Sequence, residues 1–151
     1  MKHADSQQWD AHYRKDKSVL AYPDENFVRL AAGFLNGKEP AKLIALDLGC
    51  GSGRHVVTLK EMGFGSVIGT DYSMEALINA AKRIPAFFVC AGNTAIPFRD
   101  ASFDLVVSWG SLHYRHKQFL PRMIGEIARI LRPGGWHIGT LRSSRDTYLK
   151  K

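Results

Sequence analysis

The chain has 151 residues, 45% of them hydrophobic and 23% charged, which indicates a single globular domain spanning 1–151 with a sizeable core. No apolar run approaches the roughly 20 residues that span a bilayer, and the start of the chain lacks the apolar segment of a secretory signal. The net charge of +7 arises entirely in the last quarter of the chain, because residues 1–114 contain 12 basic and 12 acidic side chains, whereas residues 115–151 contain 9 basic and 2 acidic side chains.

Two helices are expected before the first strand, within residues 1–40. Residues 6–17 form a short helix on which Trp9 and Tyr13, four positions apart, share one face. At this point two interpretations stay open: the two rings pack the helix onto the domain, or the helix is a lid over a bound ligand. A second helix begins near Pro23 and carries apolar residues at helical spacing, so it packs against the core.

Residues 43–73 are the centre of the sequence, because they combine a strand, a glycine loop, a helix and a second strand. Residues 44–48 suit a strand buried on both faces of a parallel sheet. Gly49, Gly51 and Gly53 follow at alternate positions, and glycine lets a ligand lie against bare backbone. The N–H groups that open the next helix then favour negative charge on that ligand.

The second strand of this unit, residues 67–69, is followed by Asp71. Ligands of doubly wound sheets bind beyond the carboxyl ends of the strands, and an acid about 20 residues after a glycine loop can hold ribose hydroxyls. The unit therefore predicts a ligand that contains a nucleoside and has an anionic end.

The remaining elements complete an α/β pattern. In chain order they are a helix over 74–83 capped by Ser73, an apolar strand over 86–91, a strand over 104–108, an amphipathic helix over 119–131, a turn over 132–135 and a strand over 136–141. The core is thus expected over 41–141, and the polar, basic residues 142–151 are too few to supply two further strands. Strand five then becomes an exposed edge, which invites pairing with a second copy.

Cys50 lies in the glycine loop and Cys90 ends a predicted strand, so both are expected to be free thiols of a cytoplasmic protein. A small residue tolerated in a tight loop accounts for Cys50 better than a nucleophile does.

The glycine loop does not match the G-x-G-x-x-G fingerprint of dinucleotide sites. From Asp47 to Gly53 it reads D-x-G-x-G-x-G, and this resembles the first motif of the class I S-adenosylmethionine-dependent methyltransferases. Four later stretches resemble further motifs of that family, in the family's order: 71–73, 96–98 with 102–108, 112–114 and 131–135. Within the family the chain looks most like ubiquinone and menaquinone C-methyltransferases and small-molecule O- and N-methyltransferases.

The resemblance implies a Rossmann-like, mostly parallel sheet with the strand order 3-2-1-4-5, without the two closing strands of the family. It also implies S-adenosylmethionine as the cofactor and S-adenosylhomocysteine as the product. Its cofactor site would consist of the methionine-side residues Gly49, Cys50, Gly51 and Gly53 supported by Asp47, the ribose acid Asp71, the adenine neighbour Tyr72, and the flanking Tyr13 and Trp109.

The sequence departs from the family pattern at the adenine end of the site. The acid that usually bonds the adenine amino group falls on Gly92, and Asn93 is the nearest side chain that can substitute. On the substrate side, Trp109, Ser111 and His113 should border the sulfonium and the acceptor. His113 is a candidate general base, but a packing residue at the start of a helix is the preferred interpretation.

The expected function is methyl transfer to a small-molecule acceptor, for which alignment and exclusion of water matter more than a dedicated catalytic residue. An RNA or protein methyltransferase is an alternative that suits the basic residues 115–151, although no nucleic-acid motif supports it. A cofactor-binding module without activity of its own is another. A nicotinamide oxidoreductase is disfavoured by the loop spacing, and no metal site is expected.

Overall fold

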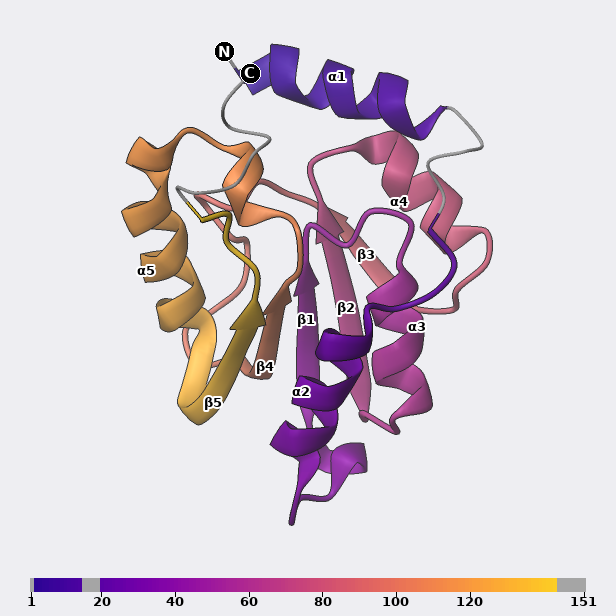
Figure 1. Cartoon of the computed structure of the whole chain (residues 1–151), viewed down its shortest axis with the longest axis vertical. Helices are drawn as coiled ribbons and strands as arrows, with labels where there is room; N and C mark the ends of the chain where they lie inside the picture. The colour runs from indigo at the N-terminus through magenta and orange to yellow at the C-terminus, as the bar shows by residue number, and fades with distance from the viewer. Residues whose placement is uncertain (1, 15–19, 144–151) are drawn as a thin grey trace.

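A parallel sheet of five strands in the order β3-β2-β1-β4-β5 forms the centre of the fold (Figure 1). The computed structural model describes residues 2–14 and 20–143. Its strands are β1 (Ile44–Leu48), β2 (Ser66–Asp71), β3 (Phe87–Cys90), β4 (Phe103–Ser108) and β5 (Leu131–Gly139). The predicted fold class and strand order are therefore confirmed.

Helices cover both faces of this sheet, as a doubly wound fold requires. One face carries α2 (Glu25–Leu35), α3 (Arg54–Glu61) and α4 (Met74–Ala81), and the other carries α5 (Leu120–Ile130). Short 3-10 turns lie at Pro40–Lys42 (η2), Leu112–Tyr114 (η3) and Lys117–Phe119 (η4). Helix α1 (Lys2–Tyr13) packs on neither face, and Figure 1 shows it lying across the carboxyl ends of the strands.

The two cores follow from the alternation of side chains along each strand. In β1, Ala45 faces α2, α3 and α4, where the fully buried Phe27 is one of its neighbours in the core. Leu46 faces the opposite way and packs with Met123 and Ile127 of α5. Because both faces are buried, β1 is the continuous apolar run that the sequence predicted.

Helix boundaries follow the capping residues. Ser73 caps α4 as predicted, because its Oγ accepts a hydrogen bond from the N–H of Ala76 at 3.2 Å. Helix α2, in contrast, begins later than predicted, because Asp24 rather than Pro23 marks its start and accepts from the N–H of Asn26 at 2.9 Å. The prediction of a helix over 6–17 also had the wrong start, since α1 begins at Lys2, and residues 15–17 lie outside the described part of the chain.

Strand β5 is longer than the predicted strand over 136–141, because it begins before the glycine turn. Leu131 pairs with Phe103 and Trp136 pairs with Leu105, so the residues between them form a bulge within the strand instead of a turn before it. Gly134 supplies the left-handed backbone of that bulge, with φ of +79°. The strand then ends at Gly139, short of the predicted end.

The two edges of the sheet are partly exposed. Strand β3 is shorter than the predicted 86–91, and Phe87 is 75% exposed, so an apolar sequence here marks an edge and not a buried strand. At the other edge Trp136 is 47% exposed and packs against the ring of Phe34, with centroids 5.6 Å apart. Pairing of the β5 edge with a second copy stays a prediction.

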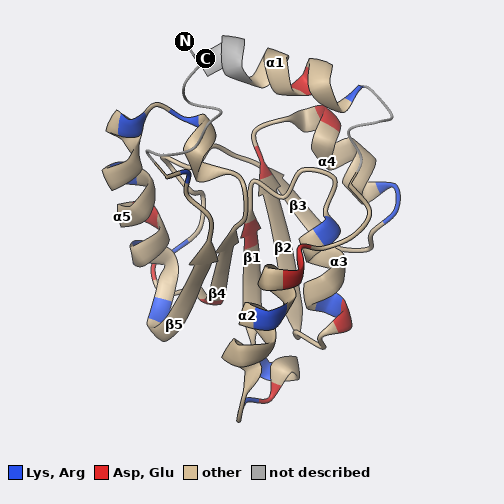
Figure 2. Ribbon diagram, viewed as in Figure 1, with Lys and Arg blue, Asp and Glu red and all other residues tan. Residues whose placement is uncertain are grey.

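Figure 2 shows basic residues along α5 and in the turns on either side of it. Some of them make structural ion pairs: Arg132 Nη1 lies 2.7 Å from Asp104 Oδ2, which also accepts the N–H of Ile44 at 2.8 Å. Asp104 thus joins β1, β4 and β5 at the end of the sheet remote from α1. Over residues 2–14 and 20–143, no helix combines the length and the apolar character that crossing a membrane requires.

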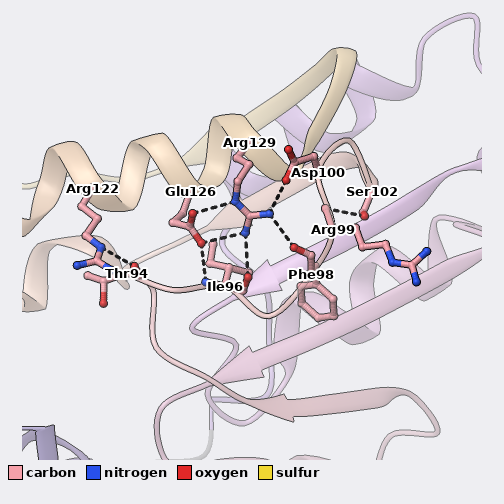
Figure 3. A network of polar contacts seen from close by, with 9 residues as sticks. All are labelled: Thr94, Ile96, Phe98, Arg99, Asp100, Ser102, Arg122, Glu126 and Arg129. Atoms are coloured by element: carbon pink, nitrogen blue, oxygen red, sulfur yellow. Dashed lines mark hydrogen bonds and ion pairs between the residues drawn. The ribbon is translucent and has the colours of Figure 1, made fainter.

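A second network joins α5 to the segment between β3 and β4 (Figure 3). Arg129 donates to the carbonyl oxygens of Ile96 and Phe98 at 2.9 and 2.8 Å, and it pairs with Glu126 and Asp100. Glu126 in turn accepts the N–H of Ile96 at 2.7 Å. The bonds from Arg129, with that from Ile96, lower the pKa of Glu126 to about 2.

Candidate cofactor and substrate site

A cavity of about 1030 Å³ lies at the carboxyl edge of the sheet, between α1 and the glycine loop. The glycine loop, the ends of β2, β3 and β4, and α1 all contribute to its wall. Most of the predicted site residues line it, namely Tyr13, Gly49, Cys50, Gly51, Asp71, Tyr72, Gly92, Asn93, Trp109 and Ser111. Asp47, Gly53 and His113 are not among its lining residues.

The glycine loop presents bare backbone to the cavity. Gly49 and Gly51 adopt φ of +79° and +52°, which side chains rarely tolerate. A Cβ atom at Gly49 would collide with Ser111, and one at Gly51 would collide with the Tyr13 hydroxyl. The loop is anchored to β2, since the N–H groups of Gly49 and Cys50 both donate to the carbonyl oxygen of Thr70, at 2.7 and 2.8 Å.

Asp71 connects this loop with the start of α4. One carboxylate oxygen accepts the N–H of Gly51 and the other accepts the N–H of Ser73, both at 2.8 Å. Each carboxylate oxygen can accept more than one hydrogen bond, so Asp71 retains capacity for ligand hydroxyls. Burial raises the pKa of Asp71, and the backbone N–H donors oppose that rise.

Asp47 lies behind the loop, with 1% of its surface exposed. Within the described residues, its Oδ2 atom is buried without a hydrogen-bond partner. Desolvation, followed by the negative charge of Asp71, raises the pKa of Asp47 to about 7. An unpaired acceptor next to a bare-backbone cradle fits a cofactor that carries positive charge at its methionine end.

Gly53 has a packing role instead of a place in the cavity wall. It precedes α3 with φ of +83°, and a Cβ atom there would meet Ile84 Cδ1 at 2.5 Å. Cys50 is buried in the loop, and burial raises the pKa of its thiol well above the usual value. A thiol that stays protonated is a poor nucleophile, which agrees with the prediction that Cys50 is only a small residue of the loop.

Helix α1 is fastened to α4 by polar contacts at one side of the cavity. Asp10 Oδ1 accepts the hydroxyl of Ser73 at 2.5 Å and the N–H of Glu75 at 3.3 Å, so it adds a second cap to α4. The side chain of Asn79 donates to the carbonyl oxygen of Tyr13 at 3.1 Å. Arg14 also pairs with Glu75 at 3.1 Å, on the exposed surface.

On the other side of the cavity, α1 is held by aromatic contacts. Trp9 packs edge-on against Tyr114, with ring centroids 4.9 Å apart, and both residues line the cavity. Tyr13 points its hydroxyl at the glycine loop, and desolvation raises its pKa, so the hydroxyl stays protonated. Helix α1 thus packs onto the domain and also forms part of the cavity wall, so the lid interpretation stays a prediction.

On the predicted substrate side, Ser111 donates to the carbonyl oxygen of Leu48 at 2.7 Å and fills the space beside Gly49. Trp109 borders the cavity and packs against Phe27 at a centroid distance of 5.9 Å. His113 lies in η3 with its ring 4.3 Å from that of Tyr114, outside the cavity lining.

His55 and Arg115 are among the cavity residues that were not singled out from the sequence. His55 is 3% exposed, its ring lies 4.3 Å from that of Phe27, and burial lowers its pKa to about 4, so it is neutral at physiological pH. The sequence signal that could have identified His55 is its place in the first helical turn after the glycine loop. Arg115 follows η3 and reaches Tyr72, with its guanidinium carbon 5.1 Å from the ring centroid. No local pattern predicts that long-range contact.

Comparison with known proteins adds independent information. Residues 45–135, more than half of the chain, match the family model described as a methyltransferase domain. The chain is 39% identical over 106 residues to the mitochondrial arginine-hydroxylase NDUFAF5 of Homo sapiens, and this match covers 70% of the chain and 30% of that protein. It is 38% identical over 103 residues to the probable tRNA methyltransferase 9B of Bos taurus, covering 68% of this chain and 22% of that protein.

Solved structures agree with this assignment. A SAM-dependent methyltransferase of Methanosarcina mazei shares 31% identity and a TM-score of 0.61, covering 68% of this chain and 53% of that chain. The protein solved in complex with the Haloferax volcanii Trm112 methyltransferase activator shares 29% identity and a TM-score of 0.69, and the match covers 86% of this chain and 58% of that chain. The chain thus spans less than two thirds of each of these proteins, and the narrower likeness to quinone methyltransferases stays a prediction. In both fold and sequence, the chain belongs to the class I methyltransferases that use S-adenosylmethionine.

Proposed function

We propose that the chain transfers the methyl group of S-adenosylmethionine to a small-molecule acceptor held in the cavity beneath α1. The observation that carries the proposal is the roof of that cavity, because α1 is fastened to α4 by Asp10 and packs on Tyr114 through Trp9. At about 1030 Å³ the cavity is at the upper end of the volumes typical of ligand sites, which suits a nucleoside cofactor together with a small acceptor.

The residues of the chain take distinct roles in this proposal. The backbone at Gly49 and Gly51 receives the methionine end, Asp71 binds the ribose and Tyr72 flanks the purine base. S-adenosylmethionine supplies an electrophilic methyl group. The protein therefore has to align the acceptor with that group and to exclude water, and α1 serves the second task.

On the acceptor side, the proposal relies on Trp109, Ser111 and His55. Trp109 and His55 line the cavity with their ring centroids 6.2 Å apart, which gives the acceptor an aromatic wall with one neutral imidazole. Because His55 is uncharged at physiological pH, it can accept or donate a hydrogen bond without a charge that would repel a sulfonium. His113 stands outside the cavity lining and receives no role here.

Calorimetric titration with S-adenosylhomocysteine, run beside NAD, tests the cofactor part of the proposal. We expect micromolar binding of the first ligand and none of the second, with the affinity lost in Asp71→Asn. Glu39→Gln is the matched control, because this exposed acid pairs only with Lys42 on the surface among the described residues. Binding of NAD in preference to S-adenosylhomocysteine would refute the proposal.

Turnover tests the acceptor part. Release of S-adenosylhomocysteine is measured with a panel of phenols, quinols and amines, and with tRNA. The tRNA arm addresses a second candidate, an RNA acceptor, which is favoured by the likeness to a probable tRNA methyltransferase and by the basic residues along α5 (Figure 2). Methylation of tRNA that weakens steeply with salt would replace the small-molecule proposal.

Absence of turnover with every acceptor, together with tight cofactor binding, would favour a binding module without activity of its own. A cytoplasmic location is part of the small-molecule proposal, whereas the name of one relative places that protein in mitochondria. Immunofluorescence of the full-length protein in its own cells tests the location.

A further inference from the structure

The strand order fixes where the base of a bound nucleoside lies, and this inference rests on the proposed cofactor site. The glycine loop follows β1, Asp71 ends β2, and Gly92 and Asn93 follow β3, which is the next strand outward. A ligand with its anionic end at the glycine loop and its ribose at Asp71 therefore directs its base toward Tyr72, Gly92 and Asn93.

At this purine end, Gly92 leaves a space that other residues border. A Cβ atom on Gly92 would lie 3.4 Å from the ring of Tyr72 and 3.8 Å from Nη2 of Arg115. The guanidinium of Arg115 also stacks on Tyr72, 5.1 Å from the ring centroid. Arg115 comes from the segment after β4, so its side chain reaches across the cavity to the ends of β2 and β3.

The hydrogen-bonding groups at this end are unusual for an adenine site. Arginine only donates hydrogen bonds, whereas the 6-amino group of adenine needs an acceptor. In the described part of the chain, Asp71 is the one carboxylate that lines the cavity, and it already accepts from Gly51 and Ser73. Among the side chains at the purine end, the hydroxyl of Tyr72 and the amide of Asn93 each combine a donor with an acceptor, and the amide holds them side by side, as the N6–N7 edge of adenine requires.

We propose that Arg115 is a specificity residue for the purine base, and that its guanidinium fork donates to the base at the edge where position 6 lies. A 6-oxo purine presents two acceptors there, O6 and N7, which match the fork of arginine. Adenine presents one acceptor, N7, beside a donor. The site thus accepts a hypoxanthine base through Arg115 and an adenine base through Asn93, and discriminates weakly between them.

The test compares S-adenosylhomocysteine with S-inosylhomocysteine by calorimetry, on the wild type and on single variants. In the wild type we expect dissociation constants within about tenfold of each other. Arg115→Met weakens S-inosylhomocysteine about tenfold more than S-adenosylhomocysteine, since one matched pair of hydrogen bonds is lost. Arg115→Lys keeps the charge but not the fork, so it gives the same selective loss. Asn93→Ala shifts the ratio the opposite way.

Arg142→Met is the matched control, because that guanidinium stacks on Tyr114, at 5.5 Å, away from the purine end. It should leave the ratio of the two dissociation constants unchanged. A wild type that prefers S-adenosylhomocysteine by more than about a hundredfold, or an equal loss of both ligands in Arg115→Met, overturns the inference while the cofactor site stands. Binding of neither ligand overturns the cofactor site and the inference together.

Discussion

Replacing Asp10 tests whether α1 is a lid whose docking is coupled to the cofactor site. The Asp10 carboxylate accepts from the hydroxyl of Ser73 at 2.5 Å and from the N–H of Glu75 at 3.3 Å. Hydrogen bonds to a charged group contribute about 1.5–3 kcal/mol, and a carboxylate at a helix N-terminus about 0.3–1 kcal/mol more. Because the second bond is long and the site is half-buried, we expect Asp10→Ala to cost about 2 kcal/mol of docking energy.

A loss of about 2 kcal/mol corresponds to roughly 30-fold in the docking equilibrium. Amide hydrogen exchange with saturating S-adenosylhomocysteine measures it directly: exchange in α1 should accelerate by that factor, while β1 keeps its protection. The dissociation constant of the ligand should rise by no more than the same factor, because docking and binding are linked.

Arg14→Ala is the matched control, since it removes an exposed ion pair to Glu75 that is worth at most about 1 kcal/mol. We expect a change of fivefold at most, on the order given by that energy. Unchanged α1 exchange in Asp10→Ala would refute the coupling. A uniform loss of protection across the whole chain would also refute the coupling, because Asp10 would then contribute to global stability alone.

Three further predictions concern the glycine loop, its buried acid and the α5 network. Gly51→Ala places a Cβ atom against the Tyr13 hydroxyl at φ of +52°, so it should weaken S-adenosylhomocysteine at least tenfold by calorimetry; Gly125→Ala, with open space around it in α5, should not. The pKa of Asp47, raised from 3.8 to about 7, means that the folded state holds the proton more tightly, so stability falls as pH rises through this range. Asp47→Asn should therefore raise the melting temperature more at pH 8 than at pH 5, and an equal gain at both would contradict the shift. Arg129→Met removes the bonds to Ile96, Phe98, Glu126 and Asp100, so it should lower the free energy of unfolding in urea by about 2 kcal/mol. Arg122→Met is the control: it loses one bond, to Thr94, and should lower the same free energy by about 0.5 kcal/mol.

The sequence predicted the central sheet because the signals there are local. Residues 44–48 form a short apolar run, and Ser73 combines a hydroxyl with a following helical pattern, so both elements were placed correctly. Strand β5 was placed less well, because its first residue pairs with Phe103 across a bulge, and pairing across the sheet leaves no mark in the local pattern.

The residues of the candidate site also divide into those that local sequence signals predict and those that depend on contacts across the fold. Residues fixed by the chain's local geometry, such as Gly51 and Asp71, could be predicted to meet at one edge of the sheet, and they do. Arg115 could not, because its contact with Tyr72 depends on a side chain that crosses the cavity from another strand. The chemistry of His113 allows a general base, but packing is the interpretation that the sequence favours, and the 3-10 turn that carries His113 leaves it outside the cavity lining.

The buried acid behind the glycine loop gives the protein a means of sensing the charge of its ligand. Desolvation raises the pKa of Asp47 to about 7, so this carboxyl group can gain or lose a proton near neutral pH. Charges act over several Å in a low-dielectric interior, so a sulfonium in the cavity favours the ionised carboxylate, whereas a neutral thioether does not. Binding of S-adenosylmethionine should release a proton and binding of S-adenosylhomocysteine should not, a difference that calorimetry in buffers of unlike ionisation enthalpy detects. A rise in pH would then increase the affinity for S-adenosylmethionine relative to that for S-adenosylhomocysteine, and so promote the exchange of product for new cofactor between turnovers.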